Sequence, residues 1–138
     1  MATIKEDYVS YEVAKLLKEK GFDEECRAYW DSRIDDLPKE YEIIRFTEEP
    51  IHQPYDNMHS IRKRCLAPTH QMAMRWLRDV HKLSIEPFYM FPVIWEIDLK
   101  YIDKKTDLSE FEDIRDKSYN SYEEATEAGI KYCLENLI

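Results

Sequence analysis

Glycine is almost absent from this chain: Gly21 and Gly129 are the only two among its 138 residues. Average usage of about 7% would give about ten. Loops that bind phosphate groups depend on closely spaced glycines, and neither the dinucleotide-binding pattern nor the P-loop pattern is present. We therefore expect no nucleotide-binding loop of these kinds.

The sequence also lacks the features of a secreted or membrane-spanning chain. Its three cysteines, Cys26, Cys65 and Cys133, are odd in number and too few for a disulfide framework. No stretch approaches the roughly 18 apolar residues that a membrane span needs, and residues 1–7 hold no apolar run typical of a signal peptide. We expect a cytoplasmic protein with reduced thiols and no membrane contact.

Charge and hydrophobic side chains are both plentiful. The net charge is −9, and charged residues make up 36% of the chain, above the usual proportion of about 25%. Hydrophobic residues at 43%, with 18 aromatic rings, can still supply a core. Because domains commonly span roughly 100–200 residues, we expect a single domain over residues 1–138 that needs no disulfide or metal to fold.

Hydrophobic periodicity predicts three helices. The first is capped by Ser10 and ends at Gly21, and the second follows Thr69 with a strong apolar stripe of helical period. The third begins with a capping box, in which Ser121 is followed three residues later by Glu124.

Four segments have the character of strands: Cys26–Trp30, Tyr41–Phe46, Ile85–Phe91 and Val93–Ile102. The last alternates apolar and charged residues, as a half-buried antiparallel strand does. Pro87 favours a sheet edge for the third, and residues 47–68 hold three prolines and no clear period, which indicates an irregular connection. The fold class is therefore α+β, an antiparallel sheet of about four strands with three helices on one face, in the order α-β-β-α-β-β-α.

Two smaller features complete the structural prediction. Gly129 lies inside the third helix, where glycine costs up to about 1 kcal/mol relative to alanine, and this favours close packing of that helix on the sheet. A helical turn is expected around Ser109–Ile114, within an otherwise charged connection.

A family resemblance covers about half of the chain. Its blocks are Val9–Phe22, Cys65–Thr69 with Trp76–His81, and Tyr119–Ala125. Together they resemble small uncharacterised proteins of anaerobic gut bacteria and of their phages and mobile elements. The resemblance implies an intracellular protein of phage-related origin, and it carries no activity or site, because none is assigned to that group.

Four metal-ligating residue types lie within a short stretch: His52, His59, Cys65 and His70. Zinc favours tetrahedral sets of cysteine and histidine, but this spacing matches none of the common ligand patterns. Cys65 and His70 also suggest a nucleophile and its base, although no accompanying signature is present. A metal- or thiol-dependent enzyme that uses residues 52–70 is thus one hypothesis, beside ordinary polar histidines and a buried cysteine. We expect no cofactor.

Basic residues concentrate between Ser60 and Lys82, where six face a single acidic residue, Asp79. The run Arg62, Lys63 and Arg64 suggests contact with an acidic protein partner. Nucleic acid is a weaker interpretation, because the net charge of −9 opposes a polyanion. The alternatives are an ordinary solvated surface and contact with an acidic patch on a second copy of the chain.

Four consecutive large apolar residues, Phe88, Tyr89, Met90 and Phe91, fall in the strand interrupted by Pro87. A strand shows alternate side chains to its two faces, so an edge strand of this composition exposes apolar surface. This favours pairing with a second chain as a twofold dimer, with coverage by the chain itself as the alternative.

These patterns favour a binding protein over an enzyme. We expect a cytoplasmic protein-interaction or adaptor module that self-associates through Phe88–Phe91 and contacts an acidic partner through Arg62–Arg64. A metal- or thiol-dependent enzyme and a nucleic-acid binder remain the alternatives, and no catalytic residue is assigned.

Overall fold

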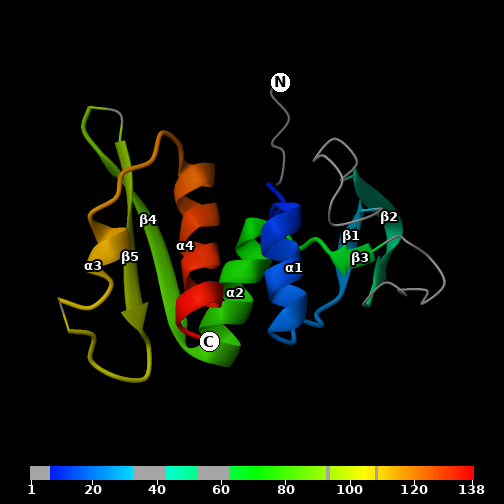
Figure 1. The fold of residues 1–138 in the computed structure, drawn as a ribbon, viewed down its shortest axis with the longest axis horizontal. Helices are drawn as coiled ribbons and strands as arrows, with labels where there is room; N and C mark the ends of the chain where they lie inside the picture. The colour runs from blue at the N-terminus through cyan, green and yellow to red at the C-terminus, as the bar shows by residue number, and fades with distance from the viewer. Residues whose placement is uncertain (1–6, 33–42, 53–62, 93, 108) are drawn as a thin grey trace. The chain divides into compact units, whose positions relative to one another are not determined.

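The computed structural model describes residues 7–32, 43–52, 63–92, 94–107 and 109–138, and these form two compact units. The first, which we call the α1 unit, is Tyr8–Thr69. The second, the α4 unit, is made of Asp7 and His70–Ile138 among the described residues. Figure 1 shows helices and antiparallel strands in both, which confirms the α+β class. The single domain over residues 1–138 stays a prediction beside this division.

In the α1 unit, the described residues form one helix and a three-stranded sheet. Helix α1 (Tyr11–Glu19) is followed by strands β1 (Cys26–Ser32), β2 (Ile43–Ile51) and β3 (Lys63–Leu66), in the antiparallel order β2-β1-β3. The Ser10 hydroxyl accepts a hydrogen bond from the Val13 N–H at 3.2 Å, so the predicted cap is confirmed. Gly21 follows the helix with φ of +89°, a conformation that side chains disfavour.

Ion pairs connect the three strands of this sheet. Asp31 on β1 is buried, and its carboxylate lies 3.2 Å from Nε of Arg45 on β2 and 3.8 Å from Nε of Arg64 on β3. Asp31 stands directly opposite Arg64 in the sheet register. One buried carboxylate thus links the central strand to both neighbours.

In the α4 unit, the described residues form a hairpin and three helices, which can be followed in Figure 1. Its elements are α2 (His70–His81), β4 (Leu83–Met90), β5 (Ile94–Tyr101), α3 (Glu112–Arg115) and α4 (Tyr122–Asn136). Strands β4 and β5 pair antiparallel without a register shift over their whole length. Lys82, with φ of 58°, turns the chain from the end of α2 directly into β4.

Helix α4 packs closely on the hairpin. Ser121 accepts from the Glu124 N–H at 3.1 Å, as the capping box predicts. A Cβ atom added at Gly129 would lie 2.9 Å from a methyl carbon of Ile85 and 3.3 Å from one of Ile97. The prediction that Gly129 allows a close approach of helix and sheet is therefore confirmed.

The two faces of the hairpin differ, as the alternation in β5 predicts. Cross-strand partners share a face, and the pair Ile85–Leu99 and the residue Ile97 are buried beneath the helices. The opposite face carries the pairs Glu86–Asp98 and Phe88–Glu96, and all four of these side chains are exposed or half-buried.

The number of elements differs from the prediction. The described residues form five strands in two sheets, rather than about four in one, and four helices rather than three. Residues 47–68 are not wholly irregular, because β2 continues through Pro50 to Ile51 and β3 begins at Lys63. β2 lies at a sheet edge, where proline costs no ladder hydrogen bond. The expected turn near Ser109–Ile114 is the short helix α3.

Candidate functional site

The end of the β4–β5 hairpin is an exposed apolar surface. Phe91 is 91% exposed, and Phe88, Tyr89, Met90 and Ile94 are between 38% and 51% exposed. We call these five residues the hairpin tip. The structure therefore exposes the four residues that the sequence suggests for partner contact, with Phe88 and Met90 on the face opposite α4 and Tyr89 on the α4 side, and it adds Ile94 from the neighbouring strand.

Aromatic contacts hold the hairpin tip in place. The Tyr89 ring packs edge-on against Trp95 at 5.5 Å between centroids, and Trp95 packs against Tyr122 of α4 at 5.4 Å. The Tyr89 hydroxyl donates to the carbonyl oxygen of Pro92. Because these contacts tie the tip to α4, its apolar side chains are presented on a fixed frame.

Strand β4 has an open edge within the described part of the chain, where the sheet has only β4 and β5. Trp95 exchanges backbone hydrogen bonds with Tyr119 at 2.7 and 2.9 Å, so its N–H and C=O point away from β4. In a regular antiparallel pair, its partner Tyr89 then points its own backbone groups away from β5, and so do Pro87 and Ile85. Pro87 thus lies where no ladder hydrogen bond is lost, as its predicted edge position requires.

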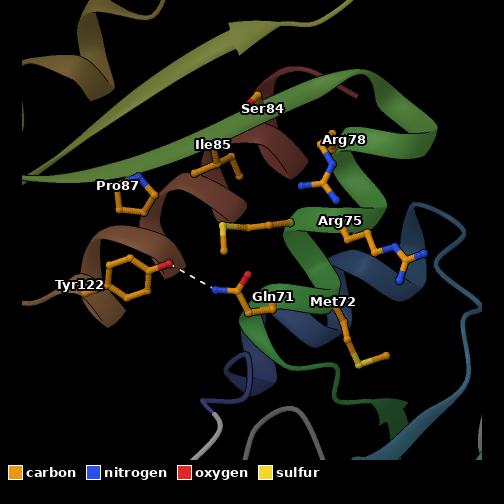
Figure 2. Close-up of a pocket in the computed structure, with 9 residues that line it drawn as sticks. Gln71, Met72, Arg75, Arg78, Ser84, Ile85, Pro87 and Tyr122 are labelled. Carbon is orange, nitrogen blue, oxygen red and sulfur yellow. Dashed lines mark hydrogen bonds between the residues drawn. The ribbon is translucent and has the colours of Figure 1, made fainter.

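A groove of about 400 Å³ lies between α2, β4 and the start of α4. Figure 2 shows its main side chains, which are Gln71, Arg75 and Arg78 from α2, Ile85 and Pro87 from β4, and Tyr122 from α4. Gln71 Nε2 donates to the Tyr122 hydroxyl at 3.3 Å across one end of the groove. The sequence gives no direct sign of this groove, because it forms where α2 and β4 lie side by side.

The groove carries positive charge on its α2 side. Asp79 lies 3.4 Å from Nε of Arg75 and 3.5 Å from Nε of Arg78, so one carboxylate faces two guanidinium groups. All three side chains are more than half exposed. One positive charge is left over, and it belongs to the basic segment that the sequence identifies between Ser60 and Lys82.

The basic run Arg62–Arg64, which the sequence suggests for contact with an acidic partner, lies partly on β3. Lys63 and Arg64 belong to this strand, whereas Arg62 lies outside the described residues. Arg64 faces the Asp31 carboxylate and lies 5.8 Å from the centre of the Tyr29 ring. Its charge is thus partly compensated within the α1 unit. Contact of this run with an acidic protein or with nucleic acid stays a prediction.

The proposed metal ligands are dispersed among different partners. His52 Nε2 lies 3.1 Å from Glu25, and His70 Nε2 lies 2.7 Å from Glu127 of α4. Cys65 is buried on β3, and His59 lies outside the described residues. Among the residues that the structure describes, no group of three or more His, Cys, Asp and Glu side chains could hold a metal ion.

The cysteines are buried and free, as expected for reduced thiols. Burial raises the pKa of Cys133 to about 12, and burial together with the charge of Glu24 raises the pKa of Cys26 to about 12. A thiol with such a pKa is almost wholly protonated at neutral pH, and the thiolate is the reactive form. These two cysteines therefore lack the character of nucleophiles.

His70, which is buried, and Glu127, which is half-buried, form a pair that the sequence does not reveal. His70 begins α2, its side chain is 8% exposed, and its Nδ1 atom is buried without a hydrogen-bond partner among the described residues. The two residues are 57 positions apart, and only the packing of α2 against α4 brings them together. A carboxylate can orient an imidazole as a base, but the groove is not lined by His70. We interpret the pair as a link between the two helices.

The described helices include none that is both long enough and apolar enough to cross a membrane. Comparison of the sequence with protein-family models and with curated proteins, and of the chain with solved structures, finds no match.

Proposed function

We propose that this protein is an interaction module that associates with a second copy of itself through the hairpin tip. The observation that carries the proposal is the exposure of five large apolar side chains on one fixed hairpin end, Phe91 above all. Exposed apolar clusters on a folded protein mark interaction sites. A twofold contact requires only that one such surface be complementary to itself.

The size and charge of this surface set the expected strength of the contact. Stable interfaces bury roughly 1,200–2,000 Å² in total, and five side chains alone supply less, so we expect a weak dimer that depends on concentration. Each copy carries a net charge of −9, and Glu96 lies directly opposite Phe88 in the sheet. Salt screens the repulsion between copies, so association should strengthen as ionic strength rises.

Replacement of Phe91 by aspartate tests the proposal. Because the side chain is 91% exposed, Phe91→Asp removes apolar contact surface without opening the core. Sedimentation velocity over a concentration series, at low and at high salt, should show dimer formation by the wild type and only monomer for the variant. Ile102→Asp is the matched control, since Ile102 is 51% exposed beyond the other end of β5. This control should associate as the wild type does.

Two outcomes would contradict self-association through the hairpin tip. A wild type that is monomeric at every concentration and salt level contradicts self-association. A Phe91→Asp variant that associates as the wild type does would show that another surface carries the contact.

We also propose a cytoplasmic location and a phage-related origin. Three free, buried cysteines suit a reducing compartment, and the origin rests on the sequence resemblance alone.

A further inference from the structure

The open edge of β4 and the groove beside it form one continuous surface of the α4 unit. The groove is lined by Ser84, Ile85 and Pro87 of β4 and, across from them, by α2 residues that include Gln71, Arg75 and Arg78. An extended chain laid along β4 would therefore have the strand on one side and the helix below it. Helix and strand edge together are a common arrangement for capturing a peptide as an added strand.

The backbone of β4 is ready to pair along this edge. By the alternation established from Trp95, the N–H and C=O groups of Ile85 point away from β5, whereas Leu83, although of the same parity, is only 1% exposed and offers no accessible group. Pro87 offers its C=O only, since proline has no N–H. The edge beside the groove thus presents one donor and two acceptors with which a short strand can pair.

The groove is chemically polarised along its length. Figure 2 shows Arg78 near the Ser84 end, Ile85 in the middle, and Tyr122 with its Gln71 partner near the Pro87 end. The two arginines share the single carboxylate of Asp79, which leaves positive charge at the first end. The middle of the floor is apolar.

We propose that the groove binds an extended acidic segment of a partner protein as an additional strand on the edge of β4. In an extended chain, side chains two positions apart point to the same side, roughly 6.6 Å apart. The segment therefore places an acidic side chain at Arg75 and Arg78, and an apolar side chain over Ile85 two positions away. This rests on the proposed function, in that it names a partner for the same interaction module, but it uses a surface other than the hairpin tip.

The first experiment is selection of peptides from a display library of random sequences about eight residues long, a typical strand length. The bait is the full-length Phe91→Asp protein, so the result is independent of self-association through the tip. We expect enrichment of peptides with an acidic residue two positions from a large apolar residue. A selection without this enrichment overturns the proposal.

Charge reversal on α2 tests where the selected peptides bind. The double variant Arg75→Glu with Arg78→Glu should weaken binding roughly tenfold or more, because two favourable charge contacts become repulsive. The matched control is Lys105→Glu with Lys117→Glu, which changes the net charge equally at two exposed positions away from the groove. Equal binding by both double variants overturns the proposal.

Methylation of the peptide backbone tests strand pairing itself. In an added strand, alternate N–H groups face β4 and the rest face solvent. Of two peptides methylated on alternate sets of amides, one should lose binding and the other should keep it, whereas equal effects of the two sets would overturn edge pairing.

The same variants separate a partner segment from a second copy of the chain. Peptide binding through charge should weaken as salt rises, whereas association through the tip should strengthen. If the Arg75→Glu, Arg78→Glu protein loses self-association in sedimentation while the equally charged Lys105→Glu, Lys117→Glu control keeps it, the occupant is a second copy and the proposed partner is excluded.

Discussion

The two units of this protein use different means to hold a small sheet together. In the α1 unit, Asp31 connects β1 to both neighbours through Arg45 and Arg64, and no residue of the outer strand β2 is buried. In the α4 unit, the hairpin is held by apolar packing, with Gly129 of α4 set directly against Ile85 and Ile97. The first sheet thus adds a buried charge to the apolar packing of residues such as Ala28, Cys65 and Leu66, whereas the second has a helix in very close contact.

This difference bears on where each unit can offer a binding surface. A sheet covered tightly on one face by α4 can leave its other face, its edge and its tip exposed and still remain folded. The α1 unit has already used its arginines on β2 and β3 to stabilise its sheet. Exposed apolar groups also lie on β2 of the α1 unit, at Ile43 and Phe46, but the α4 unit combines its own with an open strand edge and with Arg75 and Arg78.

The largest expected effect is on the α4 unit, from Gly129→Val. Its Cβ atom would lie 2.9 Å from the Ile85 methyl carbon, closer than side chains pack, and further methyl groups would crowd Ile97. Overpacking of this kind typically costs about 1–3 kcal/mol, and we expect the upper part of this range. Denaturant unfolding gives the change in free energy, and the rate of thiol labelling at Cys133 reports on the unit itself.

Glu135→Val, at an exposed position of the same helix, is the control and should change stability little. We expect labelling of Cys133 to accelerate more than labelling of Cys26 and Cys65, which lie in the α1 unit. Equal acceleration at all three thiols would indicate one cooperative transition, as the predicted single domain requires.

The next effect should appear in the α1 unit, from Asp31→Asn. An amide keeps the shape of the side chain but removes the charge that faces Arg45 and Arg64. Loss of a charged hydrogen bond costs about 1.5–3 kcal/mol when buried, and we expect the lower part of this range because Arg45 is 47% exposed. Denaturant unfolding measures it, and Cys26 and Cys65 should label faster.

Asp23→Asn, an exposed change of the same chemistry, should leave both measurements close to the wild type. A double-mutant cycle with Arg45→Ala isolates the pair. A coupling energy of zero between Asp31 and Arg45 would contradict the role given to this contact.

The contrast between the units also explains which parts of the fold could be predicted. The first residues of α1 and α4 follow from the caps Ser10 and Ser121, because helix caps are local, and the alternation of β5 follows from its one buried face. Strand β2 gives no such signal, since none of its residues is buried. Pro50 favours an irregular connection in the second half of this strand. The four residues of β3 are too few to show a period.

The two parts of the candidate site also differ in how far the sequence predicts them. The hairpin tip could be predicted from four consecutive residues, whereas the groove depends on the turn at Lys82, which returns the chain from α2 into β4. The sequence identifies Arg75 and Arg78 as part of a basic segment, but it does not predict that they lie beside a strand edge. The pairing of His70 with Glu127 likewise arises only when two helices pack.

The smallest expected effect concerns His81 at the end of α2. It would make the stability of the α4 unit depend on pH. The imidazole packs edge-on against Trp76 at 4.7 Å between centroids, and its Nε2 atom is buried without a hydrogen-bond partner among the described residues. Burial lowers the pKa of His81 below the ordinary value of 6.5. As pH falls, the imidazole of the unfolded chain is therefore protonated before that of the folded chain, so the contribution of His81 to stability is complete above pH 6.5 and declines below it.

His81→Phe keeps the aromatic contact but removes the titrating group, so the free energy of unfolding of this variant should depend less on pH between neutral and mildly acid conditions. Val80→Phe adds a ring at the exposed neighbouring position and should keep the wild-type dependence. If His81→Phe also keeps it, the imidazole is not held neutral by the fold, and the packing of this helix end is independent of pH.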